Sequence, residues 1–530
     1  MRKTVASALI LFLLLTGSMV FAQEHSDATL TIMHTSSLYN HIEEFTPFMQ
    51  PLQGGIPRLV TKISEIRAEH PNSLLVSSGR DIMGTPMFSQ YGGVASAEMM
   101  AVAGYDAALI TSIDLGAGGS IDALTVYNSV VDFPILSANL DLATFSELEV
   151  LPNTIIDVDG VSVGLFGLSN EAGGSITNLG EAVSLLDTEA VVEENLAYFR
   201  DQGVNVIVVL SALGIDRDTE IIEQYGGENG IDVVIGNETE IVLGEPEDFE
   251  TSGRQPYGPY PLVFHEDTEP TLLVYSGKFG SFLGELELTI DEDGVLQSWG
   301  GGLHFMGEDV TPDPEVQANV DALSAGINLE DIAVGEALEA IPGWFREYSF
   351  EETPLANLYA DAFLEAGEPY GAQIALVNAG AVWENLAAGE ITIADVTRIQ
   401  PFFNWLIVMD VTGAQLKTAL EHGVSQYGGS IEQSGPFPHV AGITYTFDPS
   451  REAGDRVTEI LLDGEPVDPE ATYTLAVNDF MGNGGDGYAV LREGTDRFNT
   501  GLTITDILEQ YIETHSPLEL PTMGRITVAE

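Results

Sequence analysis

Short apolar runs alternate with amphipathic stretches through the first half of the chain. The apolar runs have the length of buried strands, and they predict strands over residues 30–33, 73–77, 107–110, 163–168 and 205–210. Leu59 to Ile66 has the spacing of an amphipathic helix instead. Strands that are apolar throughout and are separated by helices are typical of sheets covered on both faces. The pattern therefore predicts a layered α/β domain.

The rhythm of the sequence changes near Gly301. Residues 308–314 are polar and contain proline, and residues 314–329 have a helical pattern. Strands and helices then alternate again from Gly335 to the C-terminus. Because 530 residues exceed what one hydrophobic core supports, at least two domains are expected. We predict an N-terminal domain over residues 28–307, a helical connection over 308–334 and a C-terminal domain over 335–530.

The N-terminus has the features of a cleavable secretory signal, which we assign to residues 1–22. Arg2 and Lys3 provide the positive charge, and residues 8–15 form an apolar stretch that is too short to anchor the chain in a bilayer. Ala22 provides a small residue at the cleavage position, and no cysteine follows it that could carry a lipid. We therefore expect a secreted or periplasmic protein without a membrane anchor.

Composition narrows the possible partners. The chain has 82 acidic and 18 basic residues, for a net charge of −64, and it has no cysteine. Nucleic acid is excluded as a partner because phosphate binding requires clustered cations. The absence of cysteine excludes disulfides, thiolate nucleophiles and cysteine-ligated metals. Since the acids are spread along the chain, we interpret them as a solvated surface adapted to high salt, with a role in gathering cations as the alternative.

Loops after the predicted strands carry several recognisable motifs. They include His34-Thr35-Ser36-Ser37-Leu38-Tyr39, Gly79-Arg80-Asp81, Thr111-Ser112-Ile113-Asp114, Ser211-Ala212-Leu213-Gly214 and Gly236-Asn237-Glu238-Thr239-Glu240. In order and spacing they resemble the calcineurin-like metallophosphoesterase domain of 5′-nucleotidases, and the periplasmic 5′-nucleotidase/UDP-sugar hydrolase type above all. The resemblance covers nearly the whole mature chain. It implies an α/β fold class: an N-terminal four-layer β-sandwich flanked by helices, and a smaller mixed α/β C-terminal domain.

The same resemblance implies that the catalytic machinery is missing. Family members use two divalent metals and a bridging water as the nucleophile. At the positions that match the family's metal ligands and catalytic histidine, this chain has Ser37, Tyr39, Arg80, Ser112, Ile113, Ala212, Glu238 and Glu240. Arg80 places a fixed cation where the family places metal, and Ile113 cannot transfer a proton. We therefore expect no intact catalytic residue and no metal cofactor.

Several polar side chains beside these loops leave an alternative open. Asp81, Asp114, Glu238 and Glu240 offer carboxylates that could hold a hard cation such as Ca²⁺ or Mg²⁺. We favour the interpretation that they are ordinary solvated acids. Of the two nearby histidines, we expect His34 to be structural and His41 to be exposed.

The C-terminal half resembles the 5′-nucleotidase C-terminal domain in five ordered motifs. They are Asn357-Leu358-Tyr359-Ala360-Asp361-Ala362, Val377-Asn378-Ala379-Gly380, Gly389-Glu390-Ile391-Thr392, Pro401-Phe402-Phe403-Asn404 and Asn483-Gly484-Gly485-Asp486-Gly487. The resemblance implies a nucleoside slot, by which we mean Asn378, Gly380, Phe402, Asn404, Phe480, Asn483, Gly484, Gly485 and Asp486.

The slot residues suit a nucleoside physically. By the resemblance, Phe402 and Phe480 sandwich the base and Asn404 bonds its edge, while Asp486 accepts from the ribose hydroxyls. The alternative is that both phenylalanines are core residues. Arginines that would grip phosphate are replaced, since Trp383 and Ser349 stand at their positions.

Three hypotheses follow from these patterns. The leading one is a secreted, catalytically inactive 5′-nucleotidase homologue that binds a nucleoside or nucleotide-like small molecule. The second is an active metal-dependent phosphoesterase with a rebuilt carboxylate site. The third is a structural or interaction protein whose cleft is vestigial.

Overall fold

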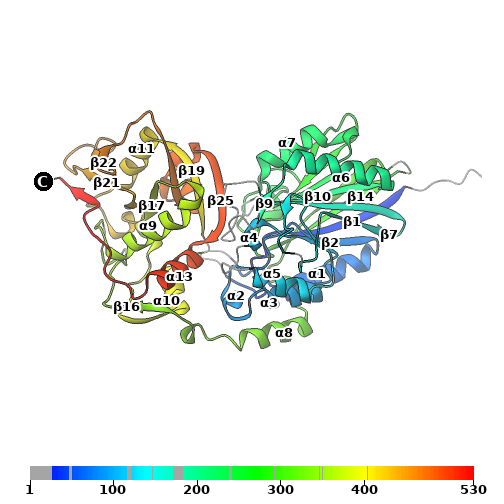
Figure 1. Cartoon of the computed structure of the whole chain (residues 1–530), viewed down its shortest axis with the longest axis horizontal. Helices are drawn as coiled ribbons and strands as arrows, with labels where there is room; N and C mark the ends of the chain where they lie inside the picture. The colour runs from blue at the N-terminus through cyan, green and yellow to red at the C-terminus, as the bar shows by residue number, and fades with distance from the viewer. Residues whose placement is uncertain are drawn as a thin grey trace, which may run out of the picture.

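The computed structural model describes residues 27–46, 51–115, 121–145, 147–170, 183–237, 241–291, 294–344, 346–348, 350–402 and 404–529. The assigned signal peptide, Glu238, Glu240 and Ser349 lie outside these residues. In the described part of the chain, none of the helices combines the length and the apolar character that a membrane span requires. Two domains lie side by side, the N-terminal one in blue to green and the C-terminal one in yellow to red (Figure 1).

Two sheets form the centre of the N-terminal domain. The first has the order β15 (Leu296–Phe305), β14 (Phe282–Ile290), β1 (Ala28–Thr35), β2 (Ser73–Ser77), β3 (Ala107–Leu109), β4 (Ile135–Leu136) and β6 (Val150–Leu151). The second has the order β12 (Leu262–Phe264), β13 (Thr271–Val274), β11 (Val233–Gly236), β10 (Val206–Ser211), β8 (Val161–Leu168) and β7 (Asn153–Val158). A two-stranded pair, β5 (Leu140–Asp141) and β9 (Ser184–Leu185), lies outside them. The five strands predicted from apolar runs are all present.

Helices cover the outer faces of both sheets. Those packed on the first sheet include α1 (Ile56–Glu69), α3 (Val94–Ala103), α5 (Asp122–Val130) and α8 (Pro314–Ser324), with the short α2 (Pro86–Tyr91) and α4 (Ser112–Leu115) nearby. Those on the second are α6 (Thr188–Gln202) and α7 (Ile215–Tyr225). An apolar core that includes Leu30, Val76 and Val208 fills the space between the sheets. This confirms the four-layer sandwich.

The connecting helix is shorter than predicted. The pattern predicted a helix over residues 314–329, but α8 ends at Ser324. Glycine is a weak helix former, and Gly326 follows the C-cap residue Ala325. Its N–H and the Tyr91 hydroxyl both donate to the Leu323 carbonyl, at 3.1 and 2.8 Å. Helix α8 packs on α1 and α3, so this part of the connection lies against the N-terminal domain.

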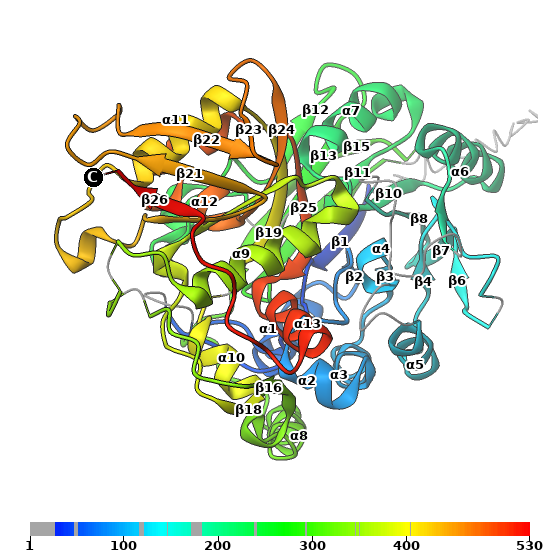
Figure 2. The same cartoon turned by 60° about the vertical axis from the view of Figure 1, so that its left-hand side comes forward.

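The C-terminal domain has a mixed five-stranded sheet with both faces covered. Its order is β20 (Pro438–Ala441), β17 (Ile374–Asn378), β24 (Thr472–Asn478), β19 (Trp405–Thr412) and β25 (Thr495–Thr503). Helices α9 (Pro354–Gly367), α10 (Ile393–Ile399) and α13 (Ile504–His515) share an apolar cluster with one face, and α11 (Gly413–Gly423) lies in the cluster on the other. Figure 2 shows α9 and α13 beside this sheet.

Smaller elements complete the C-terminal domain. A four-stranded sheet has the order β23 (Glu465–Pro466), β22 (Val457–Leu462), β21 (Ile443–Phe447) and β26 (Ile526–Val528), and β16 (Ala333–Ala337) pairs with β18 (Gly389–Thr392). The short helix α12 (Asp479–Gly482) follows β24 directly. The smaller mixed α/β domain that the sequence predicted is therefore confirmed.

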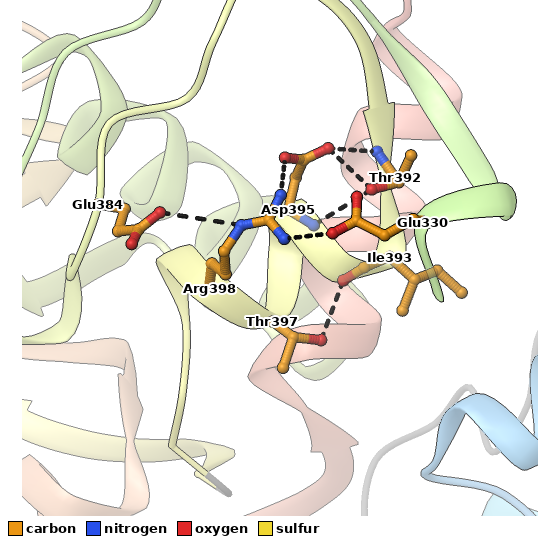
Figure 3. Close-up of polar contacts among 7 residues, drawn as sticks. All are labelled: Glu330, Glu384, Thr392, Ile393, Asp395, Thr397 and Arg398. Atoms are coloured by element: carbon orange, nitrogen blue, oxygen red, sulfur yellow. Dashed lines mark hydrogen bonds and ion pairs between the residues drawn. The ribbon is translucent and has the colours of Figure 1, made fainter. Parts of the chain in front are cut away.

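Arg398 on α10 joins the connection to the C-terminal domain (Figure 3). Its guanidinium lies 2.8 Å from Glu330 in the 3-10 turn Leu329–Asp331 and 2.5 Å from Asp395, with Glu384 at 3.9 Å. The Arg398 side chain is 43% exposed. Exposed ion pairs contribute about 0–1 kcal/mol each, so this network positions the connection more than it stabilises the fold.

Candidate functional site

The loops that carry the changed family motifs meet at one edge of the N-terminal sandwich. Ser37 follows β1 and donates its hydroxyl to Asn237 Oδ1 at 2.6 Å, beyond the end of β11. Ser112 donates its hydroxyl to Asn170 Oδ1 at 2.7 Å. Asn237 in turn donates to the carbonyls of Ser78 and Gly79, both at 2.8 Å. The sequence had not singled out Asn170 or Asn237 as functional, although Asn237 lies in one of the motif-bearing loops.

The backbone of these loops adopts a conformation that their present side chains disfavour. Ser37, Tyr39, Asn40 and Arg80 have positive φ angles of 50°, 47°, 57° and 63°. Left-handed backbone at residues other than glycine costs on the order of 1–3 kcal/mol each. The loop geometry is thus held by its surroundings, including a 2.8 Å bond from the Ser37 N–H to the Gly79 carbonyl.

An interdomain aromatic cluster, which we define as Tyr39, Met83, Ile113, Phe279 and Trp405, fills this edge. The Tyr39 and Trp405 ring centroids are 4.1 Å apart, and those of Phe279 and Trp405 are 5.9 Å apart. Trp405 begins β19 in the C-terminal domain and is fully buried. Tyr39, which the resemblance aligns with a metal ligand of the family, therefore contacts the other domain.

The Ile113 side chain extends the same contact to a second strand of the C-terminal domain. It packs against Gly501 in β25, where φ is 72°. A Cβ atom at position 501 would lie 2.2 Å from Ile113 Cδ1, so only glycine leaves room for the isoleucine. Trp405 in β19 contacts Tyr39, and Gly501 in β25 contacts Ile113. Two strands of the C-terminal domain thus contact two loops of the N-terminal domain.

The residues at the family's ligand positions do not suit two metal ions. Ile113 and Ala212 have no donor atom, and Tyr39 lies within the aromatic cluster. The Ser37 and Ser112 hydroxyls bond asparagine oxygens. Arg80 is 4% exposed, and its Nε has no hydrogen-bond acceptor in the described part of the chain. A buried guanidinium opposes cation binding at short range.

Asp81 and Asp114 are not the solvated acids that we expected, because both are buried. Asp81 accepts from the Ser77 hydroxyl at 2.6 Å and from the Leu38 N–H at 3.3 Å. Asp114 accepts from the Thr111 hydroxyl at 2.7 Å. Burial raises the pKa of Asp81 to about 7 and also raises the pKa of Asp114. The loops turn these carboxylates inward, where they support the backbone.

The two histidines of the first loop are also buried. His34 lies 2.9 Å from the Tyr260 hydroxyl through Nε2, in a structural position. His41 was expected to be exposed, and this is wrong. Its side chain packs between the rings of Phe45 and Phe279, at 4.9 and 4.0 Å. Burial lowers the pKa of both histidines to about 3, so both are neutral near physiological pH.

Asn378 and Asp486 form the centre of the nucleoside slot. Asn378 ends β17 and donates its amide to Asp486 Oδ2 at 2.8 Å. Asn478, at the end of β24, donates to Asn378 Oδ1 at 3.1 Å. Burial raises the pKa of Asp486, and the Asn378 bond opposes that shift. The Asp486 carbonyl accepts from His422 at 2.7 Å. These bonds fix the orientation of the carboxylate.

The glycine-rich loop brings further slot residues beside Asp486. Phe480 is 43% exposed, and its ring packs against Gly485, where a Cβ atom would lie 2.6 Å from the ring. Asn483 accepts from Arg497 at 2.6 Å through its side chain and from Arg492 at 2.8 Å through its carbonyl. Gly484 has φ of 83°, which requires glycine in this turn.

Phe402 and Asn404 lie on the neighbouring segment. Phe402 is half-buried and meets Trp383 edge-on at 5.5 Å, whereas Phe480 packs over the glycine loop. The Asn404 carbonyl accepts from the Ile504 N–H at 2.9 Å. Asp479 Oδ1 accepts from the N–H groups of Trp405 and Phe480, at 3.1 and 3.0 Å. These bonds place the slot next to the interdomain aromatic cluster.

The surroundings of Gly380 and Trp383 close the other side of the slot. The Gly380 N–H donates to the Gly435 carbonyl at 2.9 Å, and its own carbonyl accepts from Trp383 Nε1 at 2.8 Å. The Arg346 guanidinium carbon lies 5.5 Å from the Trp383 ring centroid. Trp383, which the resemblance aligns with an arginine of the family, contributes to the packing here.

Several known proteins are similar to this chain in sequence and in fold. The profile of the 5′-nucleotidase C-terminal domain family matches residues 333–493. A 5′-nucleotidase precursor from Thermus thermophilus is 31% identical, with 94% of this chain and 99% of that one covered and a TM-score of 0.59. The trifunctional nucleotide phosphoesterase YfkN of Bacillus subtilis is 30% identical over 91% of this chain, which spans 34% of that protein. NAD nucleotidase of Haemophilus influenzae, 20% identical, covers 96% of this chain and 100% of its own with a TM-score of 0.79, and so shares the fold.

Proposed function

The chain belongs to the 5′-nucleotidase family, as its motifs predicted, and from this premise we propose that it is an exported, catalytically inactive member that binds a nucleoside or nucleotide-like ligand. The observation that carries the proposal is the contact between Tyr39 and Trp405 at 4.1 Å. A residue at a metal-ligand position holds the two domains together. Catalysis by the family's two-metal route requires ligands at that position instead.

The residue at the position of the family's catalytic histidine also supports this proposal. Ile113 stands where the resemblance implies a catalytic histidine, and it packs against Gly501. The buried carboxylates Asp81 and Asp114 are engaged with neighbouring hydroxyls and N–H groups. We therefore favour a catalytically inactive protein over an enzyme with a rebuilt carboxylate site at these loops.

Ligand binding is supported by what the C-terminal domain has kept. Phe480 exposes 43% of its surface beside a carboxylate that Asn378 and the loop hold in place. An exposed aromatic ring next to a fixed acceptor suits a base attached to a ribose, because the ring stacks and the acceptor bonds hydroxyls. The net charge of −64 and the replacement of an arginine by Trp383 favour a nucleoside over its phosphate ester.

Export rests on the N-terminal sequence. Residues 1–22 combine positive charge, an apolar stretch and a small residue before Gln23, which together are typical of a cleavable signal. N-terminal sequencing of the exported protein tests this part of the proposal. Mature protein beginning at Gln23 supports it, and protein retained with residues 1–22 contradicts it.

Calorimetry with adenosine and AMP, beside a phosphate-release assay with AMP and UDP-glucose, tests the function. We expect adenosine to bind at least as tightly as AMP, and we expect no phosphate release in the presence of Zn²⁺, Mn²⁺ or Mg²⁺. An active relative assayed in parallel shows that the conditions permit turnover. Turnover by this chain would support the rebuilt phosphoesterase, and absence of heat with every nucleoside at millimolar concentration would support an interaction protein.

A further inference from the structure

A separate group of metal-binding side chains lies on the outer face of the first N-terminal sheet. His70 directly follows α1, and Glu285 and Glu287 alternate along β14, so both glutamates face the same side. One ligand atom from each of the three lies within 4.8 Å of the others. Bonds to Zn²⁺ from imidazole and carboxylate are about 2.0–2.2 Å, so small side-chain rotations would bring all three atoms onto one ion.

The central carboxylate of this group is buried and oriented. Glu285 is 8% exposed. One of its oxygens lies 2.6 Å from His304 Nε2 on the neighbouring strand β15, and the other lies 3.7 Å from His70 Nε2. A carboxylate ligand that is itself hydrogen-bonded by a second residue is the usual arrangement around protein metals. His304 is thus placed to hold one oxygen of Glu285, while the other oxygen is the one nearer to His70.

The charge of the group is not balanced by a permanent cation. Within the described ranges, neither Glu285 nor Glu287 forms an ion pair with lysine or arginine, and the contacts of Glu285 are with the imidazoles of His70 and His304. Two carboxylates this close repel each other unless a proton or a cation lies between them. A divalent ion would neutralise both charges at once.

The sheet also leaves room for an ion and its water. Glu285 pairs with Gly302 and Glu287 pairs with Gly300 across the β14–β15 ladder. A Cβ atom added at either glycine would meet nothing within 4 Å. The β15 positions paired directly with the two glutamates therefore carry no side chain, and His304, which pairs with Leu283, is the β15 residue that contacts Glu285. The His70 and His304 side chains are 35% and 34% exposed, so the site is open to solvent.

We propose that His70, Glu285 and Glu287 bind one divalent transition-metal ion, with Zn²⁺ as the best match, and that His304 is a positioning residue for Glu285. One imidazole nitrogen with two carboxylates suits Zn²⁺ better than Ca²⁺ or Mg²⁺, which take oxygen ligands. The site lies on elements other than the loops of the interdomain cluster, and it does not depend on the proposed function.

Equilibrium dialysis of the full chain against Zn²⁺, with Mg²⁺ in large excess, tests the site. Magnesium occupies the general acidic surface, so the zinc that remains reports a specific site. We expect one bound Zn²⁺ per chain. We expect His70→Ala and Glu287→Gln each to lower the affinity for Zn²⁺ by about tenfold or more. His304→Ala should weaken binding by about 10–100-fold, as loss of an outer hydrogen-bond partner does. Co²⁺ should give a visible absorption band that the His70→Ala variant lacks.

His515→Ala is the matched control. His515 pairs with Glu365 at 2.8 Å in an exposed contact outside any three-ligand group of the described residues. Its removal should leave zinc binding unchanged, and circular dichroism should show that all variants are folded. Zinc bound equally by wild type and by His70→Ala, or fully displaced by Mg²⁺, would overturn the proposal.

Discussion

Tyr39 in the first loop of the N-terminal domain and Trp405 in the first position of β19 pack with their ring centroids 4.1 Å apart. The contact joins the two domains at the edge where the family's ligand motifs meet. Tyr39, Phe279 and Trp405 are each buried there. Tyr39, which the resemblance aligns with a metal ligand of the family, is thus part of an apolar interface between the domains.

Trp405→Ala should destabilise the protein strongly. Removing a fully buried tryptophan costs about 3–5 kcal/mol, since the transferred surface is lost and a cavity remains. The midpoint of thermal unfolding measures the effect. Trp344→Ala is the control, because Trp344 is 36% exposed and should cost much less. Equal shifts for the two variants would show that the interdomain aromatic cluster contributes little to stability.

Phe480→Ala should weaken nucleoside binding without weakening the fold. Loss of one stacking ring costs about 1–3 kcal/mol, which is roughly five- to more than a hundredfold in Kd. The ring is 43% exposed, so thermal stability should change little. Calorimetry with adenosine measures the loss. Tyr198→Ala removes a ring of equal exposure on α6 and should bind adenosine as wild type does. An equal loss of affinity in Tyr198→Ala would mean that the measured heat does not come from binding in the nucleoside slot.

Asp81→Asn should stabilise the protein at alkaline pH and less so at acid pH. The pKa of Asp81 is raised from 3.8 to about 7 by burial, so the folded state holds a proton that the unfolded state has released. Wild-type stability contributed by this group is present below pH 3.8 and is lost as pH rises to about 7, by up to about 1.4 kcal/mol per pH unit. Asparagine does not ionise, so the Asp81→Asn variant does not lose this stability as the pH rises.

Urea unfolding of wild type and Asp81→Asn across this pH range measures the difference. The advantage of the variant should grow from pH 4 to pH 7 and then level off. Asp141→Asn is the control, because Asp141 is exposed, and its stability difference should not follow this window. A constant difference for Asp81→Asn would contradict a buried, protonated carboxyl.

His41→Phe should have the opposite pH dependence. Burial lowers the pKa of His41 from 6.5 to about 3, so only the unfolded state takes up the proton as pH falls. The stability from the neutral ring is complete above pH 6.5 and is lost toward pH 3. Phenylalanine suits the contacts with Phe45 and Phe279 and does not titrate.

Acid unfolding curves test this prediction. The His41→Phe variant should unfold at lower pH than wild type. Above pH 7 the unfolding transitions of the two proteins should be similarly cooperative. His515→Phe alters an exposed histidine and should leave the acid transition in place. An unchanged acid midpoint in His41→Phe would show that His41 is not a source of acid sensitivity.

The sequence by itself determined the local structure and the family. Apolar runs predicted β2 over residues 73–77 and β10 near 205–210, because buried strands are read from neighbouring residues. The motifs identified the family and predicted which ligand types differ from it, since a donor atom is a property of the residue itself. Ile113 and Ala212 cannot bind metal in any fold.

Tertiary structure decided what those positions do instead. The contact of Tyr39 with Trp405 and that of Ile113 with Gly501 join residues far apart in the chain, and no local pattern encodes such a pairing. Whether Asp81 and His41 face water depends on how loops from several strands close over one another. Likewise, the His70–Glu285–Glu287 group exists only because α1 ends beside β14. Burial and pKa arise from the sum of distant neighbours, which sequence order does not reveal.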